Sequence, residues 1–383
     1  MSQKITTIEH YILFDIDSAS IGGAVVRHSK NARGDLVESK ELFSVRKPIT
    51  NGEPYSFERF FEKTITTLTS VADEVHLQAL LPISQVYVNV STPWMSSQKR
   101  VVHHAQKKPY TFTQELANAM VVESTDQTHH HTSSAYHDHT VELIDNRVID
   151  VYAHGYPVRN PIGKELTEVD VHILASVMSA TTKQAFTETI QSVFHHEPVY
   201  LSNTFVNYQT TLELLPDTNN SIIVDMSGEV TDVLVVRNDH LDHIGSLPVG
   251  LHHMVRSLAD QLHVPYAKAR SLLKLSPIQH LDDGYVASLI PAYTTAFKVW
   301  FTAFFDLLDE YAKHGILSNT IVLKADAQYV AWIQEQLLSY DQLQEHMHAG
   351  ARPEIITLFQ AHDTTCFHDK ELGVFDTLIE ESA

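Results

Sequence analysis

The chain has 383 residues, 43% of them hydrophobic, which is enough for a large core and suggests two or more domains. Its 47 acidic residues outnumber the 27 basic ones, and the formal charge of −20 argues against a protein that binds nucleic acid or an anionic membrane. The single cysteine, Cys366, excludes an intramolecular disulfide, and the lack of a signal peptide or of about 18 consecutive apolar residues predicts a cytoplasmic protein without a transmembrane helix.

Apolar periodicity in the first half predicts a mixture of strands and helices. A strand–turn–strand hairpin is expected at 12–15 and 21–26, and Thr113 is a candidate N-cap for a helix at 114–124. The polar stretch 126–139 is expected to be a loop. The other predicted elements are a helix at 57–73, a strand at 85–91, strands at 140–152 and 168–176, a helix at 182–194, a strand at 199–201 and a helix at 205–215.

The second half opens with a polar turn at 217–220, a candidate hinge between two halves. The remainder of the chain is predicted to be mostly helical. The predicted elements are strands within 221–237, helices at 251–262, 266–275 and 290–313, a strand at 320–323, a helix at 328–338 and a strand at 354–358.

Two stretches of the chain share one plan. YILFDIDSASIGGAVVR, at 11–27, reads as a strand, an acidic turn and a second strand, and SIIVDMSGEVTDVLVVR, at 221–237, reads in the same way. Asp15 aligns with Asp225 when the two stretches are laid over each other, and the second apolar strand then follows at the same spacing. An internal repeat of this kind predicts two related halves.

These paired hairpins, each opening with a strand that ends in aspartate, resemble the two phosphate loops of the actin–Hsp70–hexokinase superfamily. The resemblance implies an α/β, actin-like (ribonuclease H-like) fold with two lobes. The implied parts are a first lobe at 1–91 and 179–216, an inserted subdomain at 92–178, a second lobe at 217–250 and 316–383, and a helical subdomain at 251–315.

Within this superfamily the chain is similar to the FtsA and PilM families of bacterial cell division and type IV pili. The stretch DVYAHGYPVRNPIGKELTEVDVHILAS resembles the end of the extra subdomain of FtsA, where an Asn-Pro-x-Gly turn separates two strands. SLPVGLHHMVRSLADQL and PYAKARSLLKL resemble the helical region after the second phosphate loop. The resemblance implies that the insert at 92–178 is of the SHS2 type (strand–helix–strand–strand) and contacts other proteins.

The superfamily pattern also implies a nucleotide site for ATP and Mg²⁺. Asp15 and Asp225 occupy the places of the carboxylates that hold the metal ion, usually through water. No residue can be assigned a catalytic role. The positions that the pattern places at the nucleotide are Asp15, Asp17, Ser18, Ser20, Asp225, Ser227, Gly228, Thr231, Ala325 and Asp326.

Several of these positions depart from the pattern, whose loops use glycine so that backbone N–H groups can approach the phosphates. Asp17 and Ser227 stand where the two loops have glycine, and Ala325-Asp326 stand where the adenosine motif has Gly-Gly. A carboxylate close to a triphosphate is repelled by about 1 to 4 kcal/mol. Three interpretations stay open: a site that no longer binds ATP, which we favour, a site that binds ATP and Mg²⁺ without fast hydrolysis, and an active ATPase.

Five histidines are crowded into the stretch 129–139. Imidazoles at short spacing can bind Zn²⁺, Ni²⁺ or Cu²⁺, but a bare run lacks the fixed spacing and supporting partners of a structural metal site. A solvated loop is therefore the favoured interpretation, with a metal site as the alternative. The residues are His129, His130, His131, His137 and His139.

The resemblance, together with the departures from the glycine pattern, favours a scaffold over an enzyme. The scaffold would bind components of a cell-division, type IV pilus or secretion assembly and could self-associate into filaments. The acidic stretch CFHDKELGVFDTLIEESA at 366–383 lacks the basic flanks of a membrane-binding amphipathic helix. Recruitment to the inner membrane is therefore expected through a partner and not by direct insertion. The alternative function is an ATP-binding, actin-like ATPase that polymerises into filaments.

Overall fold

The computed structural model describes residues 5–34, 36–49, 56–79, 81–135, 140–158, 160–216, 218–274, 283–326, 328–339, 343, 347 and 352–359. Their contacts divide them into two compact units. The first unit comprises 5–16 and 21–209, and the second comprises 17–20 and 210–359. Within the described residues, no helix is both long and apolar enough to cross a membrane.

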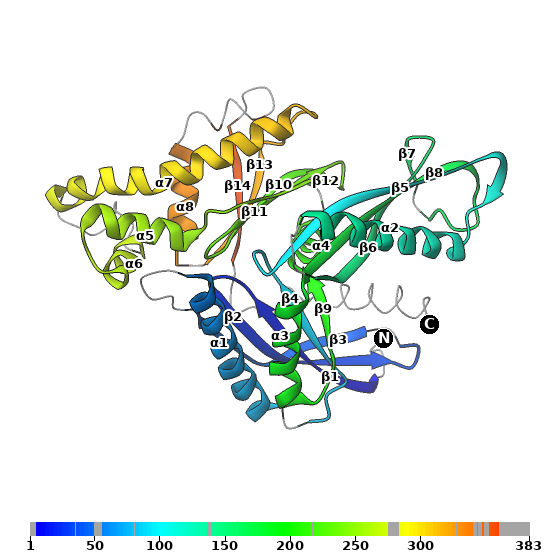
Figure 1. Cartoon of the computed structure of the whole chain (residues 1–383), viewed down its shortest axis with the longest axis horizontal. Coiled ribbons are helices and arrows are strands. Elements are labelled where there is room, and N and C mark those ends of the chain that lie inside the picture. Colours follow the sequence, from blue (N-terminus) through cyan, green and yellow to red (C-terminus); the bar gives the residue numbers. More distant parts are fainter. Residues whose placement is uncertain are drawn as a thin grey trace. The chain divides into compact units, whose positions relative to one another are not determined.

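A five-stranded sheet forms the base of the first unit, with the strand order β3-β2-β1-β4-β9 (Figure 1). β1 pairs antiparallel with β2 and parallel with β4, which pairs parallel with β9. The middle of β1 is buried on both faces, which explains why its sequence is a continuous apolar run and does not alternate. The strands are β1 (Ile5–Ile16), β2 (Ser20–Asn31), β3 (Leu36–Pro48), β4 (Gln85–Val90) and β9 (Pro198–Ser202).

Two helices of the first unit, α1 (Phe57–Gln78) and α3 (Ala180–Phe194), pack against each other and against this sheet. The hydroxyl of Ser56 caps α1 by accepting a hydrogen bond from the backbone N–H of Arg59. Phe60 and Phe186 bring the apolar faces of the two helices into the core that contains Phe14. The helix α4 (Asn203–Leu214) follows β9 directly, and the division into two units falls within it, after residue 209.

A second, antiparallel sheet of the first unit has the strand order β5-β8-β6-β7. Its main elements follow along the chain as strand, helix, strand and strand, and α2 covers one face, where Phe112, Met120 and Val171 form a small core. The SHS2 type and the boundaries 92–178 that the resemblance implies for this insert remain predictions. The elements are β5 (Met95–Thr111), α2 (Gln114–Ala135), β6 (Val141–Ala153), β7 (Tyr156–Pro157) and β8 (Glu165–Ser179).

Two features of this region differ from the sequence prediction. The predicted loop at 126–139 is wrong over 126–135, which continues α2, whereas 136–139 lie outside the described residues. The helix extends through this polar stretch because the stretch contains no Gly or Pro to end it. The strand β5 was not predicted, because its sequence is mostly polar and most of its length is exposed.

The second unit repeats the plan of the first sheet, with the order β12-β11-β10-β13-β14. β10 pairs antiparallel with β11 and parallel with β13, as β1 does with β2 and β4. The internal repeat predicted from the sequence is therefore present in the fold. The strands are β10 (Asn220–Met226), β11 (Thr231–Arg237), β12 (His240–Leu247), β13 (Thr320–Ala325) and β14 (Glu354–Phe359).

Helices cover the second sheet and form a large apolar core with it. The aromatic side chains of α7 supply much of this core, with Trp300 and Phe304 fully buried and stacked at a ring distance of 4.8 Å. The helices are α5 (Leu251–Leu262), α6 (Tyr266–Lys274), α7 (Asp283–Ala312) and α8 (Val330–Ser339).

Candidate functional site

Asp15, one of the two predicted metal-binding carboxylates, lies near the end of β1 and is paired within the first unit. Its carboxylate forms an ion pair with Arg46 of β3, and accepts a second hydrogen bond from Asn89 Nδ2 at 2.9 Å. Asn89 stands opposite Asp15 in the parallel register of β1 and β4. The guanidinium of Arg46 thus neutralises the charge that a Mg²⁺ ion would otherwise neutralise.

Asp225, the second predicted metal-binding carboxylate, has a corresponding partner in the second unit. It stands opposite Lys324 in the parallel register of β10 and β13, and Lys324 Nζ lies 3.3 Å from Asp225 Oδ2. Only 4% of the Asp225 side chain is exposed. Each aspartate of the internal repeat is therefore paired with a basic residue from another strand of its own sheet.

The turn at 17–20 is hydrogen-bonded into the loop that follows β10. Asp17 Oδ1 accepts the backbone N–H of Ala19 at 2.8 Å, which makes a local turn, and also accepts the hydroxyl of Ser227 at 2.6 Å. The fully buried hydroxyl of Ser18 hydrogen-bonds with that of Ser227 and accepts the backbone N–H of Glu229 at 2.9 Å. Asp17 and Ser227, the residues in the places of glycines, thus bond to each other.

Backbone groups close the same loop against the N-terminus of α5. The N–H groups of Leu251 and His252 donate to the carbonyl oxygens of Ser227 and Gly228 at 2.9 and 2.7 Å. A Cβ on Gly228 would lie 2.7 Å from the carbonyl oxygen of Ser18, so this position needs glycine for close backbone packing. The first N–H groups of a helix can hold a phosphate, but these two are already used.

Glu229 is nearly buried next to this loop, with 9% of its side chain exposed. Arg256 donates two hydrogen bonds to its carboxylate, at 2.9 and 2.7 Å, and His252 Nδ1 lies 3.2 Å from it. Burial alone would raise the pKa of Glu229, but the hydrogen bonds from His252 and Arg256 lower it to about 2. Glu229 is therefore an ionised anchor that binds two side chains of α5.

The other predicted nucleotide-site residues serve the fold of the second unit. Thr231 is fully buried, and its hydroxyl donates to Val249 O at 2.7 Å and accepts the indole N–H of Trp300 at 2.9 Å. Ala325 is buried at the end of β13. The carboxylate of Asp326 accepts the backbone N–H of Gln328 at 2.8 Å, just before α8 begins. In the turn at 17–20, the backbone oxygen of Ser20 accepts the backbone N–H of Asp17 at 3.2 Å.

The structure thus brings Asp17, Ser18, Ser227 and Gly228 together in one hydrogen-bonded loop cluster of the second unit. The basic partners Arg46, Lys324 and Arg256 were not predicted from the sequence, because they belong to no motif. The nearest signal is the position of Lys324, directly before Ala325-Asp326, which places it beside Asp225 once β10 and β13 are paired. His129–His131 and the other histidines of that run have no described side chains, and Cys366 lies outside the described residues.

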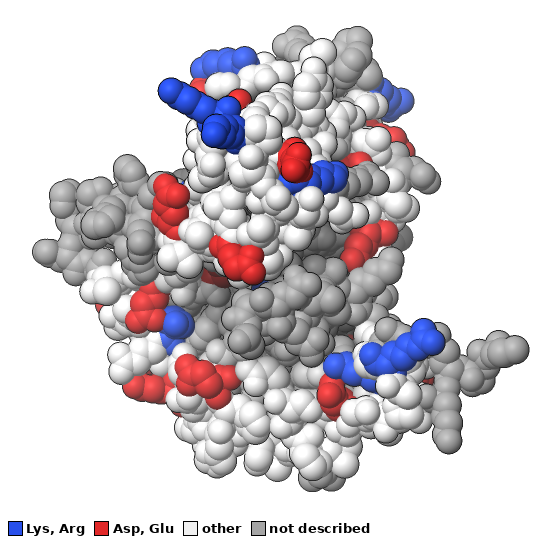
Figure 2. Space-filling view, turned by 90° about the vertical axis from the view of Figure 1, so that its right-hand side faces the viewer, with Lys and Arg blue, Asp and Glu red and all other residues white. Residues whose placement is uncertain are grey.

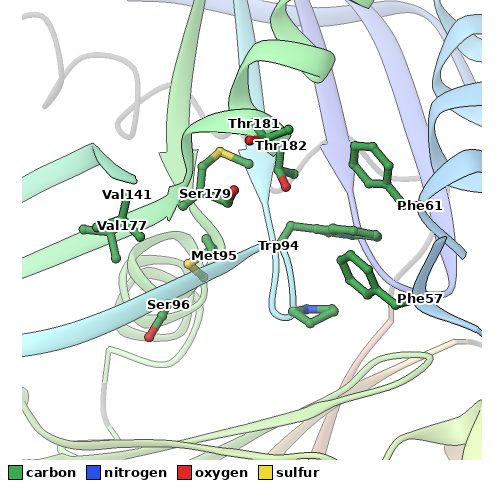
Figure 3. Close-up of a pocket in the computed structure, with 12 residues that line it drawn as sticks. Phe57, Phe61, Trp94, Met95, Ser96, Val141, Val177, Ser179, Thr181 and Thr182 are labelled. Carbon is green, nitrogen blue, oxygen red and sulfur yellow. The ribbon is translucent and has the colours of Figure 1, made fainter. Parts of the chain in front are cut away.

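A separate candidate site is an apolar pocket of about 410 Å³ in the first unit. Figure 3 shows the rings of Phe57, Phe61 and Trp94 together at one end, and Val141 and Val177 at the other. This pocket was not predicted from the sequence, because its walls come from segments far apart in the chain. The lining residues are Phe57, Phe61, Pro93, Trp94, Met95, Ser96, Val141, Val177, Met178, Ser179, Thr181 and Thr182.

Two features suit the pocket to binding. Phe57 is 56% exposed at the start of α1, which is unusual for a large aromatic side chain. Trp94 is 3% exposed, and its buried indole N–H has no hydrogen-bond partner among the described residues. An apolar concave surface is typical of a ligand or peptide site.

Figure 2 shows how the described charged side chains are distributed over one face of the molecule. The described Lys and Arg side chains on this face form small separate groups, and acidic side chains lie between these groups. A continuous basic patch is the usual footprint of nucleic-acid binding. The expectation from the formal charge of −20, that the chain does not bind nucleic acid, stays a prediction.

No protein-family model and no curated protein matches the sequence. Among solved structures, the PilM–PilN type IV pilus biogenesis complex contains a chain that is 12% identical, with a TM-score of 0.60 over 94% of this chain and 93% of that one. The ethanolamine utilization protein EutJ from Carboxydothermus hydrogenoformans is 11% identical, with a TM-score of 0.40 over 92% of this chain and 85% of that one.

A Bacteroides thetaiotaomicron VPI-5482 protein with an actin-like ATPase fold and unknown function is 7% identical, with a TM-score of 0.43 over 94% of this chain and 95% of that one. The chain from the PilM–PilN complex has the highest TM-score of the three. Its similarity extends over nearly the full length of both chains, and it shows that this chain has the actin-like α/β fold of PilM, as the sequence predicted.

Proposed function

We propose that this chain is an actin-like scaffold of a type IV pilus, secretion or cell-division assembly. In this proposal it binds a short apolar peptide of a partner protein in the pocket lined by Phe57, Phe61 and Trp94. The observation that carries the proposal is the pocket itself, which is apolar, open and flanked by an exposed aromatic ring. The similarity to a chain taken from a pilus biogenesis complex supports the choice of assembly.

The chemistry of the pocket indicates the kind of peptide. Its aromatic end would accept apolar side chains of the peptide. The formal charge of −20 favours basic residues beside the apolar ones, since opposite charges steer partners together. A partner anchored in the inner membrane would recruit the scaffold to it.

The loop cluster supports a role without ATP hydrolysis. Asp15 and Asp225, which would hold Mg²⁺, are paired with Arg46 and Lys324. A nucleotide would have to break these ion pairs and displace the bonded hydroxyl of Ser227 before its phosphates could bind. We therefore favour loss of nucleotide binding, with an ATP-dependent, polymerising ATPase as the alternative. Self-association into filaments is part of the proposal, and sedimentation at high concentration tests it.

Site-specific photocrosslinking in cells tests the peptide site. A photoreactive amino acid is placed at Phe57, beside the pocket, and separately at Leu77, an exposed apolar residue near the other end of the same helix. We expect position 57 to crosslink one partner through an apolar segment identified by mass spectrometry, and position 77 to give no such product. Equal products at both positions, or none at position 57, would refute the proposed site.

A further inference from the structure

One face of the β5-β8-β6 sheet carries a cluster of histidine and carboxylate side chains. Val169 and Val171 of β8 are buried in the core beneath α2, so Glu168 and Asp170 lie on the opposite face, because successive side chains of a strand alternate. His103 of β5 stands directly opposite Asp170 in the antiparallel register. One ligand atom from each of His103, Glu168 and Asp170 lies within 4.8 Å of the other two.

A second histidine approaches the cluster from the other side of β8. His154 directly follows β6, and its Nδ1 lies 3.9 Å from Glu168 Oε2. Its other ring nitrogen, Nε2, lies 3.2 Å from the hydroxyl of Thr167. A hydrogen bond at the far ring nitrogen is the usual means by which a protein orients a metal-binding histidine.

The two carboxylates differ from the other paired acids of the chain. Asp15, Asp225 and Glu229 each pair with Arg or Lys. Among the described residues, Glu168 and Asp170 form ion pairs only with imidazoles: Asp170 with His103 at 2.7 Å, and Glu168 with His154. An imidazole can exchange its proton for a metal ion, whereas a guanidinium cannot.

We propose that His103, Glu168 and Asp170, with His154 as the fourth ligand, form a binding site for a divalent transition-metal ion such as Zn²⁺. Imidazole nitrogen and carboxylate oxygen are ligands that Zn²⁺ accepts, and two imidazoles make Ca²⁺ or Mg²⁺ a poor fit. Ligand atoms about 2.1 Å from a tetrahedral zinc ion lie about 3.4 Å apart. The side chains of His103, Glu168 and Asp170 have to draw together to reach this spacing, and His154, which lies outside this group of three, has to move toward it as well.

The test measures Zn²⁺ affinity of the full chain by competition with a chromophoric chelator. His129, His130, His131, His137 and His139 are changed to serine in every protein compared, so that this run does not bind the ion. We expect one tight site in this parent, and at least a tenfold weaker site in His103→Ala and in Asp170→Asn. The matched control is His104→Ala, on the opposite face of the same strand, which should change the affinity less than twofold.

Co²⁺ provides a second measurement, because a four-coordinate site gives it strong visible absorption. The band should appear with the parent and with His104→Ala, and be absent with His103→Ala. Circular dichroism establishes that each variant is folded, and Glu168→Gln replaces any variant that is not. The proposal is overturned if the parent binds no Zn²⁺, or if His103→Ala and Asp170→Asn bind it as tightly as the parent.

Discussion

Lys324 and Asp225 stand opposite each other on two parallel strands, and their side chains form an ion pair that is almost completely buried. Removing one partner of such a pair leaves an uncompensated charge in the interior. We expect Lys324→Met to lower the free energy of unfolding by about 3 kcal/mol, measured by urea denaturation. The control is Lys313→Met, which removes an exposed ion pair with Glu310 and should change the stability only slightly. Equal losses of unfolding free energy in Lys324→Met and Lys313→Met would contradict the prediction.

Mg-ATP should not stabilise the protein, because the residues that would bind it are bonded to one another. A ligand present at 100 times its Kd adds about 2.7 kcal/mol to stability, which shifts the melting temperature by several degrees. We expect a shift of less than about 1 °C with millimolar Mg-ATP. A shift of several degrees that is lost in Asp225→Asn would show that the nucleotide site is functional.

Stability should depend on the ionisation of Glu229. Its pKa is lowered to about 2 in the folded chain from 4.5, so its contribution is fully present above pH 4.5 and is lost as the pH falls toward 2. This contribution is on the order of 3 kcal/mol. We expect Glu229→Gln to be less stable than the parent at pH 7, and the difference to shrink between pH 4.5 and pH 2.

Urea denaturation at a series of pH values measures this difference. The matched control is Glu310→Gln, since Glu310 is an exposed carboxylate with one lysine partner. Its stability difference from the parent should stay small at every pH. A constant difference for Glu229→Gln down to pH 2 would mean that the carboxylate is not stabilised by His252 and Arg256 as the structure indicates.

Gly228 and Gly22 should differ in their tolerance of a methyl group. A Cβ on Gly228 would lie 2.7 Å from the carbonyl oxygen of Ser18, and backbone cannot easily move away. A Cβ on Gly22 would also lie 2.7 Å from its nearest neighbour, but that neighbour is the end of the flexible Arg46 side chain. We expect Gly228→Ala to cost about 2 to 3 kcal/mol and Gly22→Ala about 1 kcal/mol, by thermal or urea unfolding. A larger loss of stability for Gly22→Ala than for Gly228→Ala would contradict the close packing between the turn at 17–20 and the loop that follows β10.

Much of the fold could be predicted from the sequence because the internal repeat is long and apolar. The hairpins at 11–27 and 221–237 lie at the centre of the two five-stranded sheets, and helices with clear periodicity, such as α5, were placed correctly. The polar strand β5 and the extension of α2 were missed, since neither has an apolar period. Tertiary pairing with β8 determines β5, and a single strand read alone cannot show it.

The candidate site could be predicted only in part, because many of its contacts join residues that are far apart in the sequence. The sequence located Asp15, Asp17, Asp225 and Ser227, because they fall in the repeated hairpins. It could not show that Asp17 bonds to Ser227, or that Lys324 neutralises Asp225, because these contacts join residues about 100 or more positions apart. The pocket at Phe57 was missed for the same reason, since its walls come from α1, β5, β6, β8 and α3.

The loop cluster of Asp17, Ser18, Ser227 and Glu229 also limits how the chain could change. Each of its polar side chains is a hydrogen-bond partner of another part of the cluster or of α5. Substituting glycine for Asp17 alone would remove an acceptor from Ser227, yet would leave Glu229 bound to Arg256. Under the proposed loss of nucleotide binding, a return to phosphate binding would require several simultaneous changes, with less stable proteins as intermediates.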